Sequence, residues 1–201
     1  MKILVDDHIN DYSPEQIALW TAELPLWRRE KVEAIRHDAG RRQSLLAYRL
    51  LCQGLREGYG ITELPTFVYG EHGKPHIIIK NEKIKIKNEA APYFSLSHCR
   101  TAVACIIDER PCGIDIESTG RKVSDSLIHY SMNNEEQAKI AHSIDKSRTF
   151  LRLWTRKEAV LKLIGTGIRD TMKDVLTNCP YPLETRETER WVMSIATSPS
   201  K

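Results

Sequence analysis

Two acidic side chains stand close together in a stretch that is otherwise apolar. The stretch "CGIDIE" (112–117) alternates like a β-strand, with Ile114 and Ile116 on one face. Asp115 and Glu117 then share the opposite face, roughly 7 Å apart. Two carboxylates at that separation repel each other by about 2 kcal/mol at an effective dielectric constant near 20. A divalent cation would relieve this repulsion, so the pair is a candidate metal site.

A third acidic candidate lies much further along the chain, in "LWTRKEAVLKLIGTGI" (153–168). Glu158 and Lys162 are four residues apart and therefore share one face of a helix. Mg²⁺ binds through a few carboxylates and takes its remaining ligands from water and substrate phosphates, so two strand acids plus Glu158 would suit it. A solvent-exposed strand edge and an ordinary surface ion pair on a helix remain open as alternatives.

A basic turn and a basic stretch could bind an anion. "GEHGKP" (70–75) presents Lys74 from a glycine-containing turn that Pro75 stiffens, although it lacks the long pattern of a P-loop. Residues 28–49 contain seven Lys or Arg against three Asp or Glu. This local excess of positive charge favours an anionic partner, either a nucleic acid or a phosphorylated small molecule.

A short alternating stretch supplies a histidine. "FSLSHC" (94–99) predicts a strand that turns Phe94 inward and Ser95 and Ser97 outward, with His98 near its end. A lone histidine is more often a hydrogen-bonded structural residue than a ligand. His98 therefore becomes a candidate only in combination with the other charged groups.

The composition is that of a folded protein. Of the 201 residues, 41% are hydrophobic and 28% are charged, and the net charge is +3. The longest apolar runs are too short to span a bilayer, and acidic residues at 6 and 7 interrupt any signal-peptide core, so we expect a cytoplasmic protein. Five cysteines without a CxxC pair indicate neither a disulfide framework nor a zinc ribbon.

Periodicity predicts a mixed arrangement of helices and strands. Helices are expected from a capping box at 13–16, and over 26–38, 41–55, 124–144 and 147–165. Strands are expected over 2–6, two within 66–79, and over 83–87, 93–98, 101–108, 112–117, near 174–178 and over 190–197. The turn at 109–111 predicts a hairpin between 101–108 and 112–117.

The order of these elements indicates the fold class. Strand, helices and strands occur once, and then the same order occurs again. We expect an α+β protein of two similar lobes, 1–108 and 109–201, related by a pseudo-two-fold duplication. The active site would lie in the cleft between the lobes.

The motifs follow one another in a characteristic order: basic helix, GKP turn, SLSH strand, GIDIE strand and WTRKEAVLK helix. This order resembles the 4′-phosphopantetheinyl transferases, in particular the long, two-lobed type that activates surfactin and other peptide synthetases. The resemblance spans about residues 26 to 168. It implies an enzyme that moves the phosphopantetheine arm of coenzyme A onto a serine of an apo acyl or peptidyl carrier protein, releasing adenosine 3′,5′-bisphosphate.

The resemblance also implies roles for the acidic cluster. Asp115, Glu117 and Glu158 match the family's ligands for Mg²⁺, with Mn²⁺ as a possible substitute. Glu158 matches the candidate base that takes the serine proton. Lys162 matches the lysine that steadies the phosphates as charge moves to the leaving group.

Coenzyme A, as the substrate, would contact a second set of residues. In the resemblance, Ser97 and His98 belong to the nucleotide site, and Lys74 and Pro75 approach the 3′-phosphate and adenine. Further cations come from the basic helices, and a recurrent glutamate falls at 135 or 136. The matching residues of the basic helices are Arg28 and Lys31, with Arg42 preferred over Arg41.

Two other functions remain as alternatives. A Mg²⁺-dependent phosphohydrolase acting on a nucleotide would share the three acids but would need no protein acceptor. A nucleic-acid-binding module could use residues 28–49, although aromatic residues make up only 7% of the chain. We expect a monomer that binds coenzyme A and a carrier protein, and neither nucleic acid nor a membrane.

Overall fold

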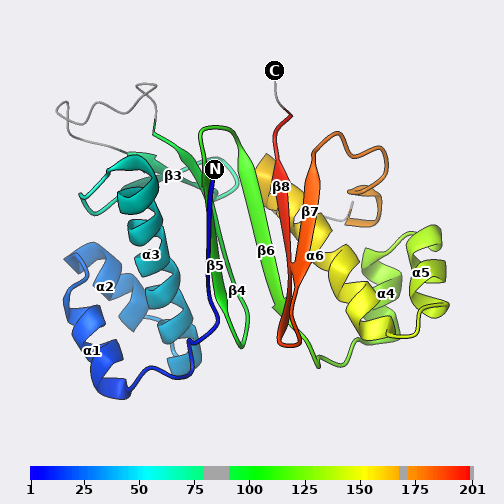
Figure 1. Ribbon diagram of the computed structural model, residues 1–201, viewed down its shortest axis with the longest axis horizontal. Coiled ribbons are helices and arrows are strands. Elements are labelled where there is room, and N and C mark those ends of the chain that lie inside the picture. Colours follow the sequence, from blue (N-terminus) through cyan, green and yellow to red (C-terminus); the bar gives the residue numbers. More distant parts are fainter. Residues whose placement is uncertain (79–90, 168–171, 200–201) are drawn as a thin grey trace.

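The computed structural model describes residues 1–78, 91–167 and 172–199 (Figure 1). The expected strand over 83–87 lies outside the described residues. In chain order the elements are β1 (Lys2–Asp6), α1 (Pro14–Ala22), α2 (Leu26–Glu33), α3 (Asp38–Tyr59), β2 (Thr66–Tyr69), β3 (Pro75–Ile78), β4 (Tyr93–His98), β5 (Val103–Asp108), β6 (Cys112–Ser118), α4 (Asp125–Ser131), α5 (Asn134–Ala141), α6 (Lys146–Ile164), the 3₁₀ turn η1 (Met172–Asp174), β7 (Leu183–Glu187) and β8 (Trp191–Thr197). The expected α+β class is confirmed.

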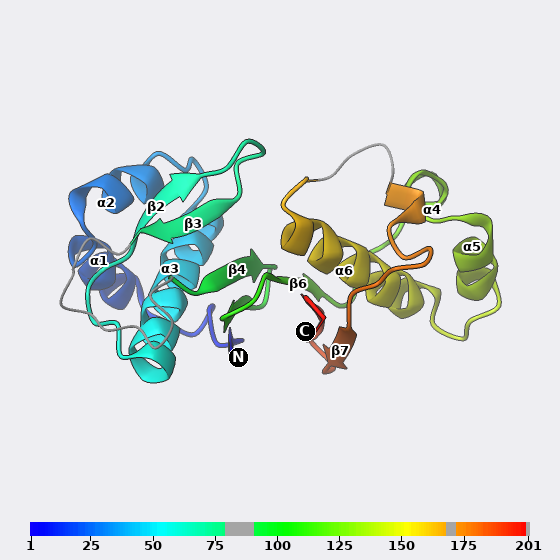
Figure 2. The same ribbon diagram turned by 90° about the horizontal axis from the view of Figure 1, so that it is seen from above.

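Two three-stranded antiparallel sheets occupy the centre of the molecule, between two groups of helices. Their strand orders are β1-β5-β4 and β6-β8-β7, and β2 and β3 form a separate hairpin. Figures 1 and 2 show α1, α2 and α3 on the outer side of the first sheet and α4, α5 and α6 on the outer side of the second. The two longest helices, α3 and α6, therefore enclose the sheets.

Strand β5 is buried on both faces because it lies between α3 and the second sheet. Cys105 and Ile107 join the apolar cluster formed with α3, whereas Ala104 and Ile106 join the cluster that contains β6 and β8 residues. All four side chains are fully buried. A strand covered on both sides needs a continuous apolar sequence, which explains the run "AVACII".

Strand β6 turns its apolar side to the first sheet and its acidic side to α6. Ile114 and Ile116 pack in the central cluster, as the sequence predicted. On the other side, Gly113 lies so close to α6 that an added Cβ would be 2.0 Å from the carbonyl oxygen of Ala159. Glycine is therefore required for the helix to approach the strand that bears Asp115.

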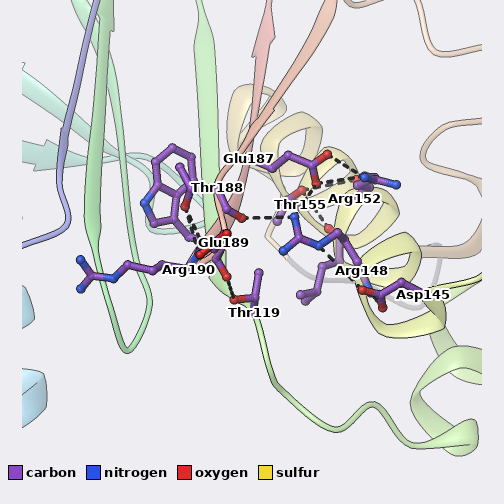
Figure 3. Close-up of polar contacts among 11 residues, drawn as sticks. Thr119, Asp145, Arg148, Arg152, Thr155, Glu187, Thr188, Glu189 and Arg190 are labelled. Atoms are coloured by element: carbon purple, nitrogen blue, oxygen red, sulfur yellow. Dashed lines mark hydrogen bonds and ion pairs between the residues drawn. The ribbon is translucent and has the colours of Figure 1, made fainter.

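Helix α6 is fixed against the β7–β8 hairpin by polar contacts along its first half. Arg152 binds the Glu187 carboxylate through two nitrogens, at 3.1 and 2.6 Å, and Arg148 approaches the same carboxylate at 3.4 Å (Figure 3). Further along, the Thr155 hydroxyl lies 2.8 Å from that of Ser194 on β8. These contacts set the position of the following turns of α6, which carry the candidate site residues.

The expected hairpin between 101–108 and 112–117 is wrong. Strand β5 pairs with β1 on one edge and β4 on the other, so it has no free edge for β6. Strand β6 pairs instead with β8, placing Asp115 opposite Ser194. The turn at 109–111 thus carries the chain from one sheet to the other.

Other boundaries also differ from the prediction. The expected helix over 124–144 is two helices. Helix α4 ends at Ser131, and Asn133 caps the start of the next helix, α5. The expected strand near 174–178 is the end of η1 followed by turns. Strand β7 was missed because "LETRE" is a mostly exposed edge strand without an apolar alternation.

The part of the chain that the structure describes contains no helix that is both long and apolar enough to cross a membrane.

Candidate active site

Side chains from β4, β6 and the C-terminal part of α6 meet in one cluster. Lys162, on α6, donates to Asp115 Oδ1 of β6 at 2.7 Å and to Ser97 Oγ of β4 at 2.9 Å. The Ser97 hydroxyl lies 2.8 Å from the same Asp115 oxygen. The structure therefore brings together three of the residues predicted from the sequence, although the chain separates β4 from α6 by some fifty residues.

Serine side chains connect β4 to β6. The backbone N–H of Ile114 donates to Ser95 Oγ at 3.2 Å, and that of Ile116 donates to Ser97 Oγ at 3.3 Å. The two serines are 7% and 5% exposed, so the prediction that they point outward is wrong. They face away from the α3 core as expected, but the second sheet covers that face.

The two principal carboxylates are buried without full compensation. Asp115 is 5% exposed and Glu158 is 8% exposed. Asp115 Oδ2 and Glu158 Oε1 have no hydrogen-bond partner among the described residues. Burial, reinforced by the charge of Asp115, raises the pKa of Glu158 from 4.5 to about 7, although the Lys162 ammonium opposes this effect.

Glu117, the third predicted acid, is half-buried and lies nearer the surface. Burial raises its pKa, the Asp115 carboxylate raises it further, and Arg121 and Lys162 act in the opposite direction. The nearest approach to Arg121 is 3.7 Å. Asp115, Glu117 and Glu158 therefore interact electrostatically, as expected for acids that share one face of β6 and the facing side of α6.

These acids suit a divalent cation in their chemistry. Carboxylate oxygens are the protein ligands that Mg²⁺ prefers, and Asp115 Oδ2 and Glu158 Oε1 receive no hydrogen bond from the residues that the structure describes. In the described residues, however, no three His, Cys, Asp or Glu side chains form a ready-made metal cluster. The residues fit a cation that takes only some of its ligands from the protein.

Lys74 links the β2–β3 hairpin to the end of α6. Its ammonium donates to the carbonyl oxygens of Lys162 and Leu163, both at 2.7 Å, and so caps the C-terminus of the helix. Burial lowers the pKa of Lys74. Lys74 and Pro75 line a cavity of about 220 Å³, together with side chains of β4 and α6 such as Phe94.

His98 ends β4 beside the acidic cluster. The residue is partly open to solvent, but the atoms packed around its imidazole lower its pKa, and the Lys162 cation lowers it further. A neutral imidazole offers one donor and one acceptor at this position.

The predicted cations of the basic helices are held within the first half of the molecule. Arg28 donates to the Ser44 carbonyl and hydroxyl oxygens at 2.7 and 2.8 Å, and Lys31 donates to the Tyr69 hydroxyl at 2.7 Å. Arg42 donates to two carbonyl oxygens, those of residues 9 and 12, in the segment before α1. None of these contacts joins Arg28, Lys31 or Arg42 to Asp115.

The sequence did not predict a role for Lys157, although it lies in the "WTRKEAVLK" motif. Its side chain is fully buried and its ammonium contacts four oxygens. These are Glu136 Oε2 at 2.7 Å and the carbonyl oxygens of Ser131, Met172 and Lys173, each at 2.9 Å. Burial lowers the pKa of Lys157, while the Glu136 carboxylate opposes that effect.

This network also shows how the two neighbouring glutamates differ. Glu136 is 4% exposed and completes a capping box with Asn133, whereas Glu135 is exposed. The sequence does contain a signal for this helix start that our prediction overlooked, namely Asn133 followed three residues later by Glu136. Lys157 and Glu136 join α4, α5, α6 and η1 directly beside Glu158.

Comparison with known proteins finds one similar family and several similar proteins. A family model described as the 4′-phosphopantetheinyl transferase superfamily matches residues 111–191, a segment that contains Asp115, Glu117, Glu158 and Lys162. Two curated relatives carry the corresponding name. A 4′-phosphopantetheinyl transferase of Bacillus subtilis is 26% identical over 145 residues, and the 4′-phosphopantetheinyl transferase AcpT of Escherichia coli O157:H7 is 29% identical over 153 residues. The segment 111–191 is therefore similar to the 4′-phosphopantetheinyl transferase superfamily.

The extent of the matches differs between relatives. The match to the Bacillus subtilis protein covers 70% of this chain and 60% of the relative. The match to the Escherichia coli protein covers 73% of this chain and 68% of the relative. The chain thus spans about 60% of the length of the Bacillus subtilis relative, and about two thirds of that of AcpT.

Proposed function

We propose that the protein transfers the 4′-phosphopantetheine group of coenzyme A to a serine of an apo acyl or peptidyl carrier protein. The observation that carries the proposal is the buried cluster of Asp115, Glu158 and Lys162, which lies within the matched family segment. A cluster with two uncompensated carboxylate oxygens and one cation suits a reaction in which a metal-bound pyrophosphate is attacked.

Each residue of the cluster has a proposed task. Asp115 and Glu158, with Glu117 at the edge, would hold Mg²⁺, which supplies charge neutralisation for the pyrophosphate when bound. Glu158 would accept the serine proton, because its carboxylate lies in the cluster and its Oε1 has no hydrogen-bond partner among the described residues. Lys162 would contact the phosphates, because its ammonium lies at the cluster on a well-anchored helix.

Coenzyme A would extend from the cluster along the first half of the molecule. The cavity beside Lys74 and Pro75 is lined by both polar and apolar side chains, as a nucleotide requires. His98 lies at the end of β4, near enough to Lys162 and Asp115 to interact with their charges, and Arg28, Lys31 and Arg42 would supply further positive charge. In this proposal, Lys74 would give a phosphate one of the donors that now cap α6.

We also propose the two-lobed arrangement with the active site between the lobes. It is supported by the matching strand orders, β1-β5-β4 and β6-β8-β7, in which the last strand of each half lies in the middle. Each sheet is also covered by the longest helix of its own half, α3 or α6. Such a protein would supply both halves of the site from one chain, so a monomer would suffice.

The direct test is incubation with coenzyme A, Mg²⁺ and a panel of apo carrier proteins, followed by intact mass spectrometry. At least one carrier should gain a single phosphopantetheine group. Asp115→Ala and Glu158→Ala should abolish the gain, whereas Glu135→Ala, which removes an exposed acid, should not. If no carrier gains mass while coenzyme A is hydrolysed, the phosphohydrolase alternative is correct. Full activity of the Asp115 and Glu158 variants would contradict the proposed site.

A further inference from the structure

Ser97 lies where β4, β6 and α6 meet, and its hydroxyl has three polar neighbours. These are Lys162 Nζ at 2.9 Å, the backbone nitrogen of Ile116 at 3.3 Å and Asp115 Oδ1 at 2.8 Å. The side chain is 5% exposed. A hydroxyl can donate once and accept twice, so these contacts use its whole hydrogen-bonding capacity. Little capacity remains for a direct bond to a substrate.

The direction of each bond follows from the chemistry of the neighbours. An ammonium and a backbone N–H can only donate, so Lys162 and Ile116 occupy both lone pairs of Ser97 Oγ. The hydroxyl proton must therefore be donated to Asp115. Asp115 Oδ1 then receives two hydrogen bonds, one from Ser97 and one from Lys162.

This arrangement treats the two oxygens of Asp115 differently. Oδ1 is held by two donors, whereas Oδ2 is buried and has no hydrogen-bond partner among the described residues. We propose that Ser97 is a positioning residue that fixes the Asp115 carboxylate, so that Oδ2 remains available to a divalent cation. The inference rests on the proposed metal-dependent transfer, and it gives Ser97 a role other than direct contact with the nucleotide.

Ser95 separates this role from a purely structural one. It lies two residues earlier on β4 and accepts a hydrogen bond from the Ile114 N–H at 3.2 Å, which connects the strands in the same way. Among the described residues, Ser95 makes no hydrogen bond to a carboxylate. Loss of the Ser95 hydroxyl should therefore weaken the contact between β4 and β6 but leave the orientation of Asp115 unchanged.

The experiment measures binding of Mn²⁺ to the 201-residue chain, with coenzyme A present and no carrier, from the electron paramagnetic resonance signal of free Mn²⁺. Ser97→Ala should weaken binding by about 10- to 100-fold, as is typical when a residue that orients a metal ligand is lost. Ser97→Thr, which keeps the hydroxyl, should recover most of the affinity. Ser95→Ala should change the dissociation constant by no more than about twofold.

A parallel kinetic measurement uses a carrier that the unmodified protein modifies. Ser97→Ala should raise the Mg²⁺ concentration for half-maximal rate by a similar factor and leave the KM for the carrier unchanged. If the alanine variant does not fold, Ser97→Cys, whose thiol is a weak donor, gives the same comparison.

Two results would overturn the inference: Mn²⁺ affinity unchanged in Ser97→Ala or Ser97→Cys, or an equal loss in Ser95→Ala. Both differ from failure of the proposed function, in which the unmodified protein would modify no carrier at all.

Discussion

Replacing Lys157 by methionine should destabilise the protein strongly, whereas Glu136→Gln should not. Methionine is similar in length but removes the ammonium, so Glu136 and three carbonyl oxygens lose their donor. Glu136, at 4% exposed, would keep the N–H of Asn133 as a donor. Removal of one partner of a buried ion pair costs about 3–5 kcal/mol.

Replacing Glu136 leaves the Lys157 ammonium with most of its hydrogen bonds. In Glu136→Gln the Lys157 ammonium keeps its three carbonyl acceptors and gains an amide oxygen, and glutamine can still complete the capping box. We therefore expect a cost of about 1 kcal/mol. The two variants should differ in their free energy of unfolding because only Lys157→Met leaves a buried anion without its cation.

Urea unfolding followed by circular dichroism would measure both free energies, and calorimetry should show a lower Tm by about 6–20 °C for Lys157→Met. Lys139→Met, on the exposed side of α5, is the matched control and should change stability by less than about 0.5 kcal/mol. A cost below about 1 kcal/mol for Lys157→Met, or an equal cost for Glu136→Gln, would refute the reasoning.

Three further substitutions test the packing and electrostatics around α6. Gly113→Ala should cost at least about 3 kcal/mol in urea unfolding, since its Cβ would meet backbone atoms of α6. Gly58→Ala in α3 should be neutral or stabilising, because its Cβ would meet only the Lys2 side chain, at ordinary contact distances of 3.6 Å or more. Glu187→Gln should cost about 0.5–1 kcal/mol at pH 7. Because Arg152 lowers the Glu187 pKa, this stabilisation is present above about pH 4 and is lost as the pH falls through the folded-state value; a constant difference across pH would contradict the assignment. Glu158→Gln should raise the free energy of unfolding of the metal-free protein at pH 8 by about 1–3 kcal/mol, because ionisation of Glu158 is unfavourable in the fold, and the gain should vanish below about pH 4. A less stable Glu158→Gln protein at pH 8 would show that its carboxylate is compensated.

Local pattern was sufficient to predict which faces of the strand and the helix carry the candidate site residues. Alternation placed Asp115 opposite Ile114 on its strand, and the i,i+4 spacing placed Glu158 and Lys162 on one helix face, both as observed in the sheet and α6. Such periodicities depend only on backbone geometry, so they can be read from neighbouring residues.

Contacts between distant segments could not be predicted in this way. The expected hairpin around 109–111 could be rejected only with the knowledge that β1, the first strand of the chain, pairs with one edge of β5. Likewise, Ser97 could not be identified as a buried donor to Asp115 without knowing that β4 and β6 lie side by side. Both errors arose because the segment that packs against the strand lies in a remote part of the sequence.

Lys157 illustrates a further limit. Because lysine is rarely fully buried, a reading of hydrophobicity along the sequence places Lys157 at the surface. Its burial becomes understandable only when Glu136 and three carbonyl oxygens from separate segments surround it. The burial of Lys157 therefore depends on its four oxygen acceptors, which come from distant parts of the sequence.

The central claim is that the acidic cluster directs phosphopantetheine to a protein hydroxyl and not to water. The most direct measurement compares the amount of adenosine 3′,5′-bisphosphate released with the amount of phosphopantetheine gained by an apo carrier in one reaction with coenzyme A and Mg²⁺. We predict equal amounts, and no release when the acceptor serine of the carrier is replaced by alanine. Release that continues without the acceptor serine would contradict the claim and identify the protein as a hydrolase.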